Sequence, residues 1–348
     1  MLDFNTLSLS ANLAIFIASA ILVWGAGTKI TRYADQISAR TGMGEALVGL
    51  LLVAVVTSLP EIATSFSAAY SGDAPLAVNN LLGSIAMQIA VLAVGDFIYS
   101  RRALTSVVPD PVVILQGALN IVLLSLAAMA IVVGDSQFFG AGYWTWGLLV
   151  GASYSFFKLG EANDRRPWIA NTEIEAEEVE SLLSNELHTT HLQLAIKTIA
   201  CAALILIAGF LVARSGEAIA SQSGLGSSFM GVAFVALATS LPEVSTVFAA
   251  LRRGLYTMAI SDIFGTNIIN VALLFGADLV ASGEPVFNRV GDFAVVAALL
   301  AALLTGVFLV GLAERRDRTI ARMGTDSVLV VLFYAAGLAL LYSLRDIP

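Results

Sequence analysis

The chain has 348 residues, of which 58% are hydrophobic and only 13% are charged, and its mean hydropathy is +0.86. Soluble globular domains are more polar than this, so the composition excludes an ordinary soluble protein and indicates a chain that lies largely in lipid. The net charge of −8 comes mainly from residues 161–186, which hold eight acidic residues, and the single cysteine, Cys201, excludes an internal disulfide or a thiolate metal cluster.

Apolar segments follow one another along the whole chain, separated by polar or Gly/Pro-rich stretches such as residues 72–75. Each segment is long enough to be a helix that crosses a membrane, whereas a β-barrel would show short alternating segments. The pattern therefore predicts an all-α membrane protein with ten transmembrane helices. The predicted spans are residues 11–34, 44–72, 76–99, 111–134, 139–158, 194–214, 226–251, 255–280, 291–313 and 326–344.

The basic residues predict how these spans are oriented. If the amino terminus faces outside, fifteen Lys and Arg residues fall in inner loops, and only Arg214, Arg289 and Arg345 stay outside. Positive loops remain in the cytoplasm, so we expect both termini outside and the acidic loop in the cytoplasm. The first apolar segment is too long for a cleaved signal peptide, and we take it as a span. The expected location is the cell (inner) membrane, as a multi-pass protein.

The sequence repeats itself at an offset of 182 residues. The motif Thr-Ser-Leu-Pro-Glu occurs at residues 57–61 and again at residues 239–243. Five spans precede the acidic loop and five follow it, and an odd number turns the second copy upside down. This predicts two inverted five-helix repeats, residues 1–160 and 194–348, joined by an acidic loop at 161–193, with the substrate site near the midplane. Other matched pairs are Gly49 with Gly231, Phe66 with Phe248, Gly83 with Gly265, and Asp96 with Asp278.

Each copy of the motif places a carboxylate directly after a proline inside an apolar span. Because proline has no backbone N–H, a carbonyl one turn earlier loses its helical partner. An unpaired polar group in lipid is costly unless something satisfies it, and a dehydrated cation can do so. A charge in such a place is by default a functional feature. The motif predicts an ion site of hard oxygen ligands suited to Na⁺ or Ca²⁺, from Thr57, Ser58, Glu61, Thr239, Ser240 and Glu243.

The helix after each motif adds further polar groups. Ser84 and Gln88 are four residues apart on one helical face, as are Thr266 and Asn270. Two buried carboxylates would neutralise one Ca²⁺ or be shared among several Na⁺. Without a metal they repel each other, so we expect protons to compete for them. The polar groups after the motifs are Asn79, Asn80, Ser84 and Gln88, and Ser261, Asp262, Thr266, Asn267 and Asn270.

Several acidic residues also have a purely structural interpretation. A single Pro-Glu motif in a membrane helix is also typical of a kink whose glutamate bonds a nearby group, but two copies in register argue against this. Asp96 and Asp278 lie near predicted helix ends, and we interpret them as interfacial or capping residues. Asp262 lies inside an apolar span, and two roles stay open for it, an ion ligand or a support for the ligands.

These motifs resemble those of the cation/calcium exchanger superfamily, in its sodium/calcium exchanger family. Members carry two α-repeats, each with a Gly-Thr-Ser-Leu-Pro-Glu-like motif and then a Gly-Asn-x-x-Gly-Ser-Asn-x-x-Asn-like motif. Here residues 56–61 and 238–243 read Val-Thr-Ser-Leu-Pro-Glu and Ala-Thr-Ser-Leu-Pro-Glu. Residues 79–88 read Asn-Asn-Leu-Leu-Gly-Ser-Ile-Ala-Met-Gln, and residues 261–270 read Ser-Asp-Ile-Phe-Gly-Thr-Asn-Ile-Ile-Asn. The resemblance covers all ten predicted helices.

The resemblance implies roles for individual residues. Glu61 and Glu243 would form a central Ca²⁺ site with backbone oxygens near Thr57 and Thr239. Flanking Na⁺ sites would use Ala54, Ser58, Ser84 and Glu243 on one side, and Ala236, Ser240, Thr266 and Glu61 on the other. Gln88 and Asn270 stand where relatives have Asn or Asp, and Asp262 stands where Asn is usual.

We therefore predict an antiporter that exchanges Na⁺ for Ca²⁺ by alternating access, with the first and sixth helices sliding on small residues such as Gly25, Gly27 and Gly209. The expected partners are the transported Ca²⁺ and Na⁺ and the lipid bilayer, with no nucleic acid, no cofactor and no enzymatic activity. A proton-coupled Ca²⁺ or Mg²⁺ exchanger on the same scaffold is the nearest alternative. A passive cation channel is a more distant one, and an intramembrane aspartyl protease built on Asp96 and Asp278 is disfavoured.

Overall fold

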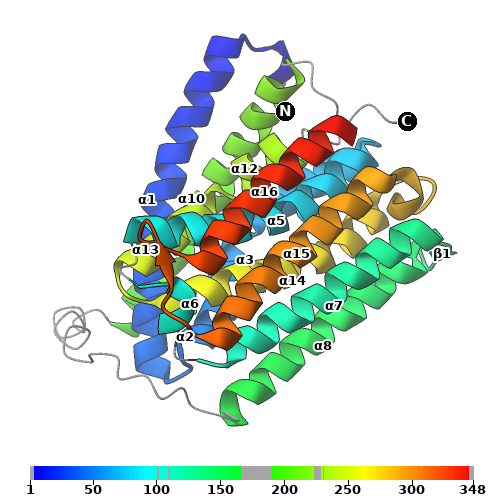
Figure 1. Cartoon of the computed structure of the whole chain (residues 1–348). Coiled ribbons are helices and arrows are strands. Elements are labelled where there is room, and N and C mark those ends of the chain that lie inside the picture. Colours follow the sequence, from blue (N-terminus) through cyan, green and yellow to red (C-terminus); the bar gives the residue numbers. More distant parts are fainter. Residues whose placement is uncertain are drawn as a thin grey trace.

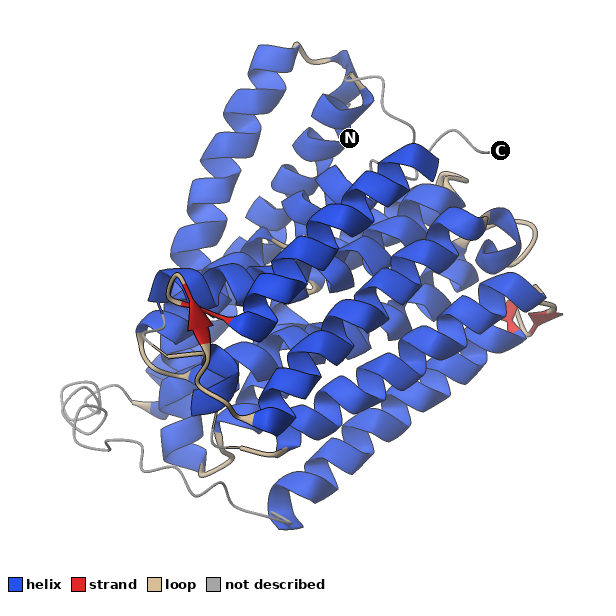
Figure 2. Ribbon diagram, in the orientation of Figure 1, coloured by secondary structure: helices blue, strands red, loops and turns tan. Residues whose placement is uncertain are grey.

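The computed structural model describes residues 4–99, 102–108, 110–165, 190–222, 229 and 231–344, and these residues are nearly all helical (Figure 2). Residues 166–189, which make up most of the predicted acidic loop, lie outside the described residues. Each of the ten predicted apolar segments coincides with a helix or with a helix that is broken near its middle.

The elements of the first half begin with a short 3₁₀ turn and a long helix. Helix α1 starts at a serine cap, where the Ser8 hydroxyl accepts a hydrogen bond from the Ala11 N–H at 3.3 Å, and it ends at Gly42 with a φ of 71°. The elements are η1 (Phe4–Thr6), α1 (Leu9–Thr41), α2 (Glu45–Val48), η2 (Gly49–Val53), α3 (Ala54–Thr57), α4 (Leu59–Tyr70), α5 (Ala74–Tyr99), α6 (Leu104–Val107), α7 (Val112–Val133), β1 (Gln137–Phe138), β2 (Ala141–Gly142) and α8 (Tyr143–Arg165).

The second half repeats this order. Its elements are α10 (His191–Ser221), η3 (Gly231–Val235), α12 (Ala236–Thr239), α13 (Leu241–Arg252), α14 (Tyr256–Val280), η4 (Val286–Arg289), α15 (Asp292–Glu314), β3 (Thr319–Ile320), β4 (Met323–Gly324) and α16 (Thr325–Leu344). In each half the two short strands pair as an antiparallel hairpin directly before the last helix.

The offset of 182 residues extends to the element boundaries. Helices α1 and α10 begin at Leu9 and His191, and α5 and α14 begin at Ala74 and Tyr256. The hairpins obey the same offset, residue for residue, and so do the π-helical turns η2 and η3 that precede the motifs. Among the helix starts α15 is the exception, because it begins two residues earlier than the offset from α7 would place it, and some helix ends differ from the offset by one to three residues. The duplication is therefore a structural one and covers far more than the motif.

Seven helices of the described residues are long and apolar enough to cross a membrane, and two bent helix pairs raise this number to nine. The seven are α1, α5, α7, α10, α14, α15 and α16, and the bent pairs are the segments broken at the two prolines. Helix α8 has 23 residues and occupies the place of the fifth predicted span.

Helices α5 and α14 lie at the centre of the molecule and contact each other (Figure 1). All side chains of residues 77–90 and of residues 257–268 are buried, as expected for helices surrounded on every side. Helices α7, α15 and α16 pack around them, and α8 lies beside α7 (Figure 1). The polar residues predicted on α5 and α14 are thus at the most enclosed position of the fold.

Helices α1 and α10 form an antiparallel pair at one side of this bundle (Figure 1). Their antiparallel direction follows from contacts between the end of α10 and the start of α1: Ser221 bonds Asn5, and Gln222 donates to the Leu7 carbonyl. Two glycines let the pair approach the broken helices closely. A Cβ on Gly209 would lie 2.3 Å from Pro60 Cγ. A Cβ on Gly27 would lie 1.7 Å from Ser245 Oγ and 3.3 Å from the Pro242 carbonyl oxygen.

Candidate ion-binding site

The broken helices place the two motifs at equivalent kinks. Pro60 and Pro242 lie in the first turn of α4 and α13, where a missing N–H is tolerated. The segments before and after the break differ in direction by 45° in the first copy and by 58° in the second. Before the first break, the Ala54 carbonyl accepts the hydroxyls of Thr57 at 3.3 Å and Ser58 at 2.7 Å. In the second copy, the Ala236 carbonyl accepts the Thr239 hydroxyl at 3.2 Å.

The carboxylate of Glu61 faces the second motif across the molecule. Glu61 is fully buried, and its Oε1 accepts a hydrogen bond from the Ser240 hydroxyl at 3.0 Å. Gln88 of α5 donates to the same hydroxyl oxygen at 3.1 Å. These contacts join residues that are more than 150 positions apart in sequence, so α4, α5 and the kink before α13 meet at one buried point.

Glu243 lies in the same buried region and has a different environment. Its side chain is fully buried, and neither carboxylate oxygen has a hydrogen-bond partner among the described residues. The carboxylates of Glu61 and Asp262 interact with it electrostatically and disfavour its negative charge. Asp262 of α14 accepts the Thr246 hydroxyl at 2.5 Å through Oδ2, while its Oδ1 is unpartnered. Three buried acidic side chains, from α4, α13 and α14, therefore interact electrostatically, although they do not converge as one metal-holding group within the described residues.

Many of the predicted site residues have buried polar atoms without partners. Most buried side-chain polar atoms in folded proteins have a partner, so a cluster without partners indicates atoms kept for something else. The unpartnered group among the described residues includes Glu61 Oε2, both carboxylate oxygens of Glu243, Asp262 Oδ1, Ser84 Oγ, Gln88 Oε1, Thr266 Oγ1 and the amide of Asn270. Almost all of these atoms are oxygens, the ligand type that Na⁺ and Ca²⁺ require.

The close approach of the halves depends on the glycines of α5 and α14. A Cβ on Gly83 would lie 2.4 Å from Val232 Cα in η3, and a Cβ on Gly265 would lie 3.0 Å from the Ala54 side chain. Larger residues at these positions would push each central helix away from the other half's kink. Ser84 and Thr266 follow these glycines directly, so the hydroxyls are held next to the kinks.

All of the site residues predicted from the sequence are fully buried or nearly so. Their carboxylates, hydroxyls and amides come from the two kinks and from α5 and α14, the helices that meet at the centre. Within the described residues, no three Asp, Glu, His or Cys side chains form a group that could hold a metal ion. An ion at this centre would therefore need hydroxyl, amide and backbone oxygens beside the glutamates.

Asp96 and Asp278 lie elsewhere, and the structure confirms the capping interpretation. Asp96 accepts the backbone N–H of Leu104 at 2.9 Å and that of Gly324 at 2.8 Å. Asp278 accepts the N–H of Val286 at 2.8 Å and that of Gly142 at 2.6 Å. These two aspartates hold loops and are separate from the buried centre.

The sequence analysis missed several polar residues that border the centre. Ser65, one turn after Glu61, accepts from Asn80 at 3.0 Å. Gln116 and Asn120 of α7 bond Ser261 and the Phe264 carbonyl of α14, both at 3.0 Å. Gln116 and Asn120 are four residues apart in an apolar helix, a spacing that marks one polar face. Comparing the two copies did not reveal Gln116 and Asn120, because the equivalent positions 298 and 302 are alanines.

A family model described as "Sodium/calcium exchanger protein" matches residues 11–158 and 193–343. The chain belongs to this family. Both matched stretches include one kinked motif and one central helix, and the gap between them falls in the acidic loop. The family consists of membrane transporters, which agrees with the many apolar helices.

Three curated proteins illustrate the range of relatives of this exchanger-family chain. The putative antiporter CaxA of Alkalimonas amylolytica is 26% identical over 307 residues, 86% of this chain and 91% of the relative. The inner membrane protein YrbG of Escherichia coli is 27% identical over 274 residues, 78% of this chain and 80% of the relative. The sodium/calcium exchanger MaX1 of Methanosarcina acetivorans is 23% identical over 366 residues, 94% of this chain and 99% of the relative.

Solved structures of the sodium-calcium exchanger NCX_Mj have the same fold. One, soaked with Na⁺ and Sr²⁺, superposes with a TM-score of 0.67 at 18% identity and covers 95% of this chain and 99% of that chain. Another, soaked with Na⁺ and Ca²⁺, gives a TM-score of 0.63 at 19% identity and covers 94% of this chain and 98% of that chain. The low identity makes this a likeness of fold.

Proposed function

We propose that this family member is a secondary active antiporter that exchanges Na⁺ for Ca²⁺ by alternating access. The observation that carries the proposal is the pair of buried glutamates, one from each kinked helix, surrounded by unpartnered oxygens. The names of the relatives MaX1 and NCX_Mj support the same ions. The proposed ligands are Glu61 and Glu243 with the hydroxyls, amides and carbonyls of Thr57, Thr239, Ser58, Ser240, Ser84, Thr266, Gln88, Asn270, Ala54 and Ala236.

The movements of Na⁺ and Ca²⁺ would be coupled because both ions bind the same two carboxylates. One Ca²⁺ or several Na⁺ would each neutralise Glu61 and Glu243, so the two loads exclude one another. An uncompensated pair of buried carboxylates is costly, and this cost disfavours movement of an empty carrier. An exchange of loads, without net leak, is the result.

We further propose that the fold is ten transmembrane helices in two inverted five-helix repeats, residues 1–160 and 194–348. The antiparallel contact of α1 with its counterpart α10 and the common offset of the element boundaries support this. The proposed location is the cell (inner) membrane, with both termini outside and the loop of residues 161–193 in the cytoplasm, on the basis of the basic residues.

The test is uptake of radioactive Ca²⁺ into proteoliposomes loaded with Na⁺. An outward Na⁺ gradient should drive Ca²⁺ accumulation, and dissipating that gradient with a Na⁺ ionophore should abolish it. Downhill flux that ignores the counter-ion would instead indicate a passive channel, and an absence of Ca²⁺ flux under every gradient would contradict the proposal.

A proton-coupled exchanger is the second candidate, and Asp262 favours it. With Asp262 the centre holds three carboxylates, one more than Ca²⁺ neutralises. A proton carried beside the metal would balance the third charge. In the same vesicles, Ca²⁺ uptake driven by a pH gradient without Na⁺ would select this candidate. Asp262→Asn should then make transport less sensitive to pH.

A further inference from the structure

A groove of about 370 Å³ lies between α1 and α10, outside the buried centre. One end is apolar and is lined by Ile21, Leu22 and Leu204. The other end carries Lys29 and Tyr33 of α1 and Lys197 of α10. Because the two helices are antiparallel, residues late in α1 lie beside residues early in α10, and this places both lysines at one end of the groove.

The two lysines are unusual in this chain. The sequence contains only three lysines, and two of them line this one groove. Both are exposed, and neither forms an ion pair or a hydrogen bond within the described residues. The third, Lys158, is paired with Glu161 at 2.8 Å. Within the described part of the chain, two cations without an ion pair therefore flank an apolar trough.

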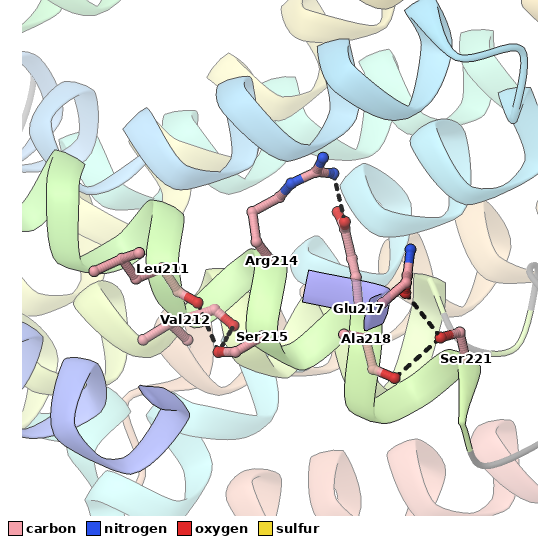
Figure 3. A network of polar contacts seen from close by, with 8 residues as sticks. Leu211, Val212, Arg214, Ser215, Glu217, Ala218 and Ser221 are labelled. Atoms are coloured by element: carbon pink, nitrogen blue, oxygen red, sulfur yellow. Dashed lines mark hydrogen bonds and ion pairs between the residues drawn. The ribbon is translucent and has the colours of Figure 1, made fainter. Parts of the chain in front are cut away.

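The duplicated scaffold does not require these charges. At the repeat-related positions, Lys29 corresponds to Leu211 and Lys197 corresponds to Ile15. The opposite end of the helix pair does contain a cation, Arg214, but Glu217 pairs with it at 2.7 Å, and their side chains point toward each other (Figure 3). Among the described residues of this helix pair, the lysine end is where positive charge without an ion pair is offered to a ligand.

The depth of the groove matches a lipid in one leaflet. Lys29 comes 20 residues after Leu9 in α1, which is about 30 Å along a helix, or one hydrocarbon thickness. Lys29 thus reaches the level of the phosphates when the first turn of α1 is at the opposite surface. Ile21 and Leu22 are then two turns deeper, at the level of acyl chains, and both are exposed toward the outside of the protein.

We propose that this groove binds an anionic phospholipid, with the phosphate between Lys29 and Lys197 and an acyl chain along Ile21, Leu22 and Leu204. Charge complementarity selects the acidic head group, and the apolar trough selects a lipid over a free anion. The lipid lies on the helix pair that covers the two kinks, so it contacts the helices that would have to move during alternating access.

The binding test is native mass spectrometry of the purified protein with mixed phosphatidylglycerol and phosphatidylcholine. The test variant, Lys29→Leu with Lys197→Ile, introduces the residues found at the repeat-related positions, and Lys158→Leu is the matched control. The wild type and the control should retain phosphatidylglycerol selectively. In the double variant this preference should fall by about tenfold or more, since each basic residue near an anionic surface contributes roughly 1 kcal/mol. An unchanged preference in a folded double variant overturns the proposal.

Cys201, the only cysteine, lines the groove with a mostly buried side chain, so the rate of its alkylation should report access to the groove in the protein without substitutions. In phosphatidylcholine vesicles, adding phosphatidylglycerol should slow alkylation of Cys201 several-fold, whereas adding inorganic phosphate should not. Equal protection by inorganic phosphate would mean a free-anion site and would overturn the lipid proposal. Replacing the glutamates of residues 173–180 by glutamine should leave the protection unchanged. If it changes Cys201 reactivity in phosphatidylcholine alone, the acidic loop is the occupant and the proposal fails.

Discussion

The two glutamates at the centre are equivalent by sequence but not by environment. Ser240 donates to Glu61, and Gln88 holds Ser240 in place. The corresponding bond is absent in the other direction, because the Ser58 hydroxyl donates to the Ala54 carbonyl. Asn270 is one methylene shorter than Gln88, and its amide has no partner in the described part of the chain. Glu243 is therefore the less restrained of the two.

Glu61→Gln and Glu243→Gln should each reduce exchange by at least about 10- to 100-fold, the range for losing a group that supports a metal site. The amide keeps the shape of the side chain and removes the charge that the ion neutralises. Initial rates of gradient-driven Ca²⁺ uptake, normalised to protein in the vesicles, measure the effect. Glu161→Gln, on the surface of α8, is the control and should transport normally. Normal transport by either test variant would refute the assignment of these ligands.

At this scale the residues predicted from the sequence are buried in the structure, their role as ligands stays a prediction, and the contacts between them were missed. The proline, the glutamate and the offset of 182 identified both kinks, because an acid in an apolar span has few explanations. The bond from Ser240 to Glu61 crosses between the halves and depends on side-chain reach, which sequence spacing does not specify. Gln116 and Asn120 could have been found from polarity alone, had each half been read separately.

At the scale of elements, α1 and α10 each pack against one of the kinks at a single glycine. Gly209 faces Pro60 and Gly27 faces the Pro242 carbonyl, so each long helix contacts the kink contributed by the opposite half. Gly25, which the sequence analysis grouped with them, has no atom within 4 Å of its would-be Cβ. Gly25 takes no part in the two close contacts, and the sliding of α1 and α10 stays a prediction.

Gly209→Ala should destabilise the protein by about 1–3 kcal/mol, since the new methyl group would overlap the Pro60 ring in a packed contact. Gly25→Ala is the matched control and should be neutral or stabilising by up to about 1 kcal/mol, because alanine is the better helix former. Thermal unfolding of the two variants in the same detergent measures the difference. A Gly209→Ala protein as stable as the control would mean that α10 is not held against the kink.

The apolar runs predicted where helices occur, but they did not predict where each helix ends. The first span was predicted at residues 11–34, whereas α1 continues to Thr41 through the charged residues Arg32, Asp35 and Arg40. Hydropathy reports contact with lipid, and a helix can continue into water without it. The π-helical turns before the motifs carry no sequence signal of their own and were missed.

At the scale of the whole molecule, two aspartates connect the halves in a crossed arrangement. Asp96 of the first half binds the hairpin of the second half at Gly324, and Asp278 of the second half binds the hairpin of the first half at Gly142. Each aspartate also caps the short helical turn that follows its own helix. The partner atoms of the two aspartates are related by the same offset of 182.

Asp96→Asn and Asp278→Asn should each lower the free energy of unfolding by about 1.5–3 kcal/mol, the range for hydrogen bonds to a charged group, because an amide presents only one acceptor oxygen. Thermal unfolding measures the loss, and the surviving folded protein should keep its exchange activity per molecule. Asp292→Asn, at the exposed start of α15, is the control and should change stability little. Lost transport without lost stability would instead make these aspartates part of the ion path.

The contact of Asp96 with the second hairpin also affects the order in which the protein folds during synthesis. Asp96 and Gly324 are 228 residues apart, so one carboxylate of the first half has to wait for its second partner until residue 324 has left the ribosome. A nascent chain that stops before residue 324 lacks the backbone N–H that would donate to the second carboxylate oxygen of Asp96. The crossed bond of Asp96 is therefore completed last, because both partners of Asp278, Gly142 and Val286, are present once residue 286 has been made.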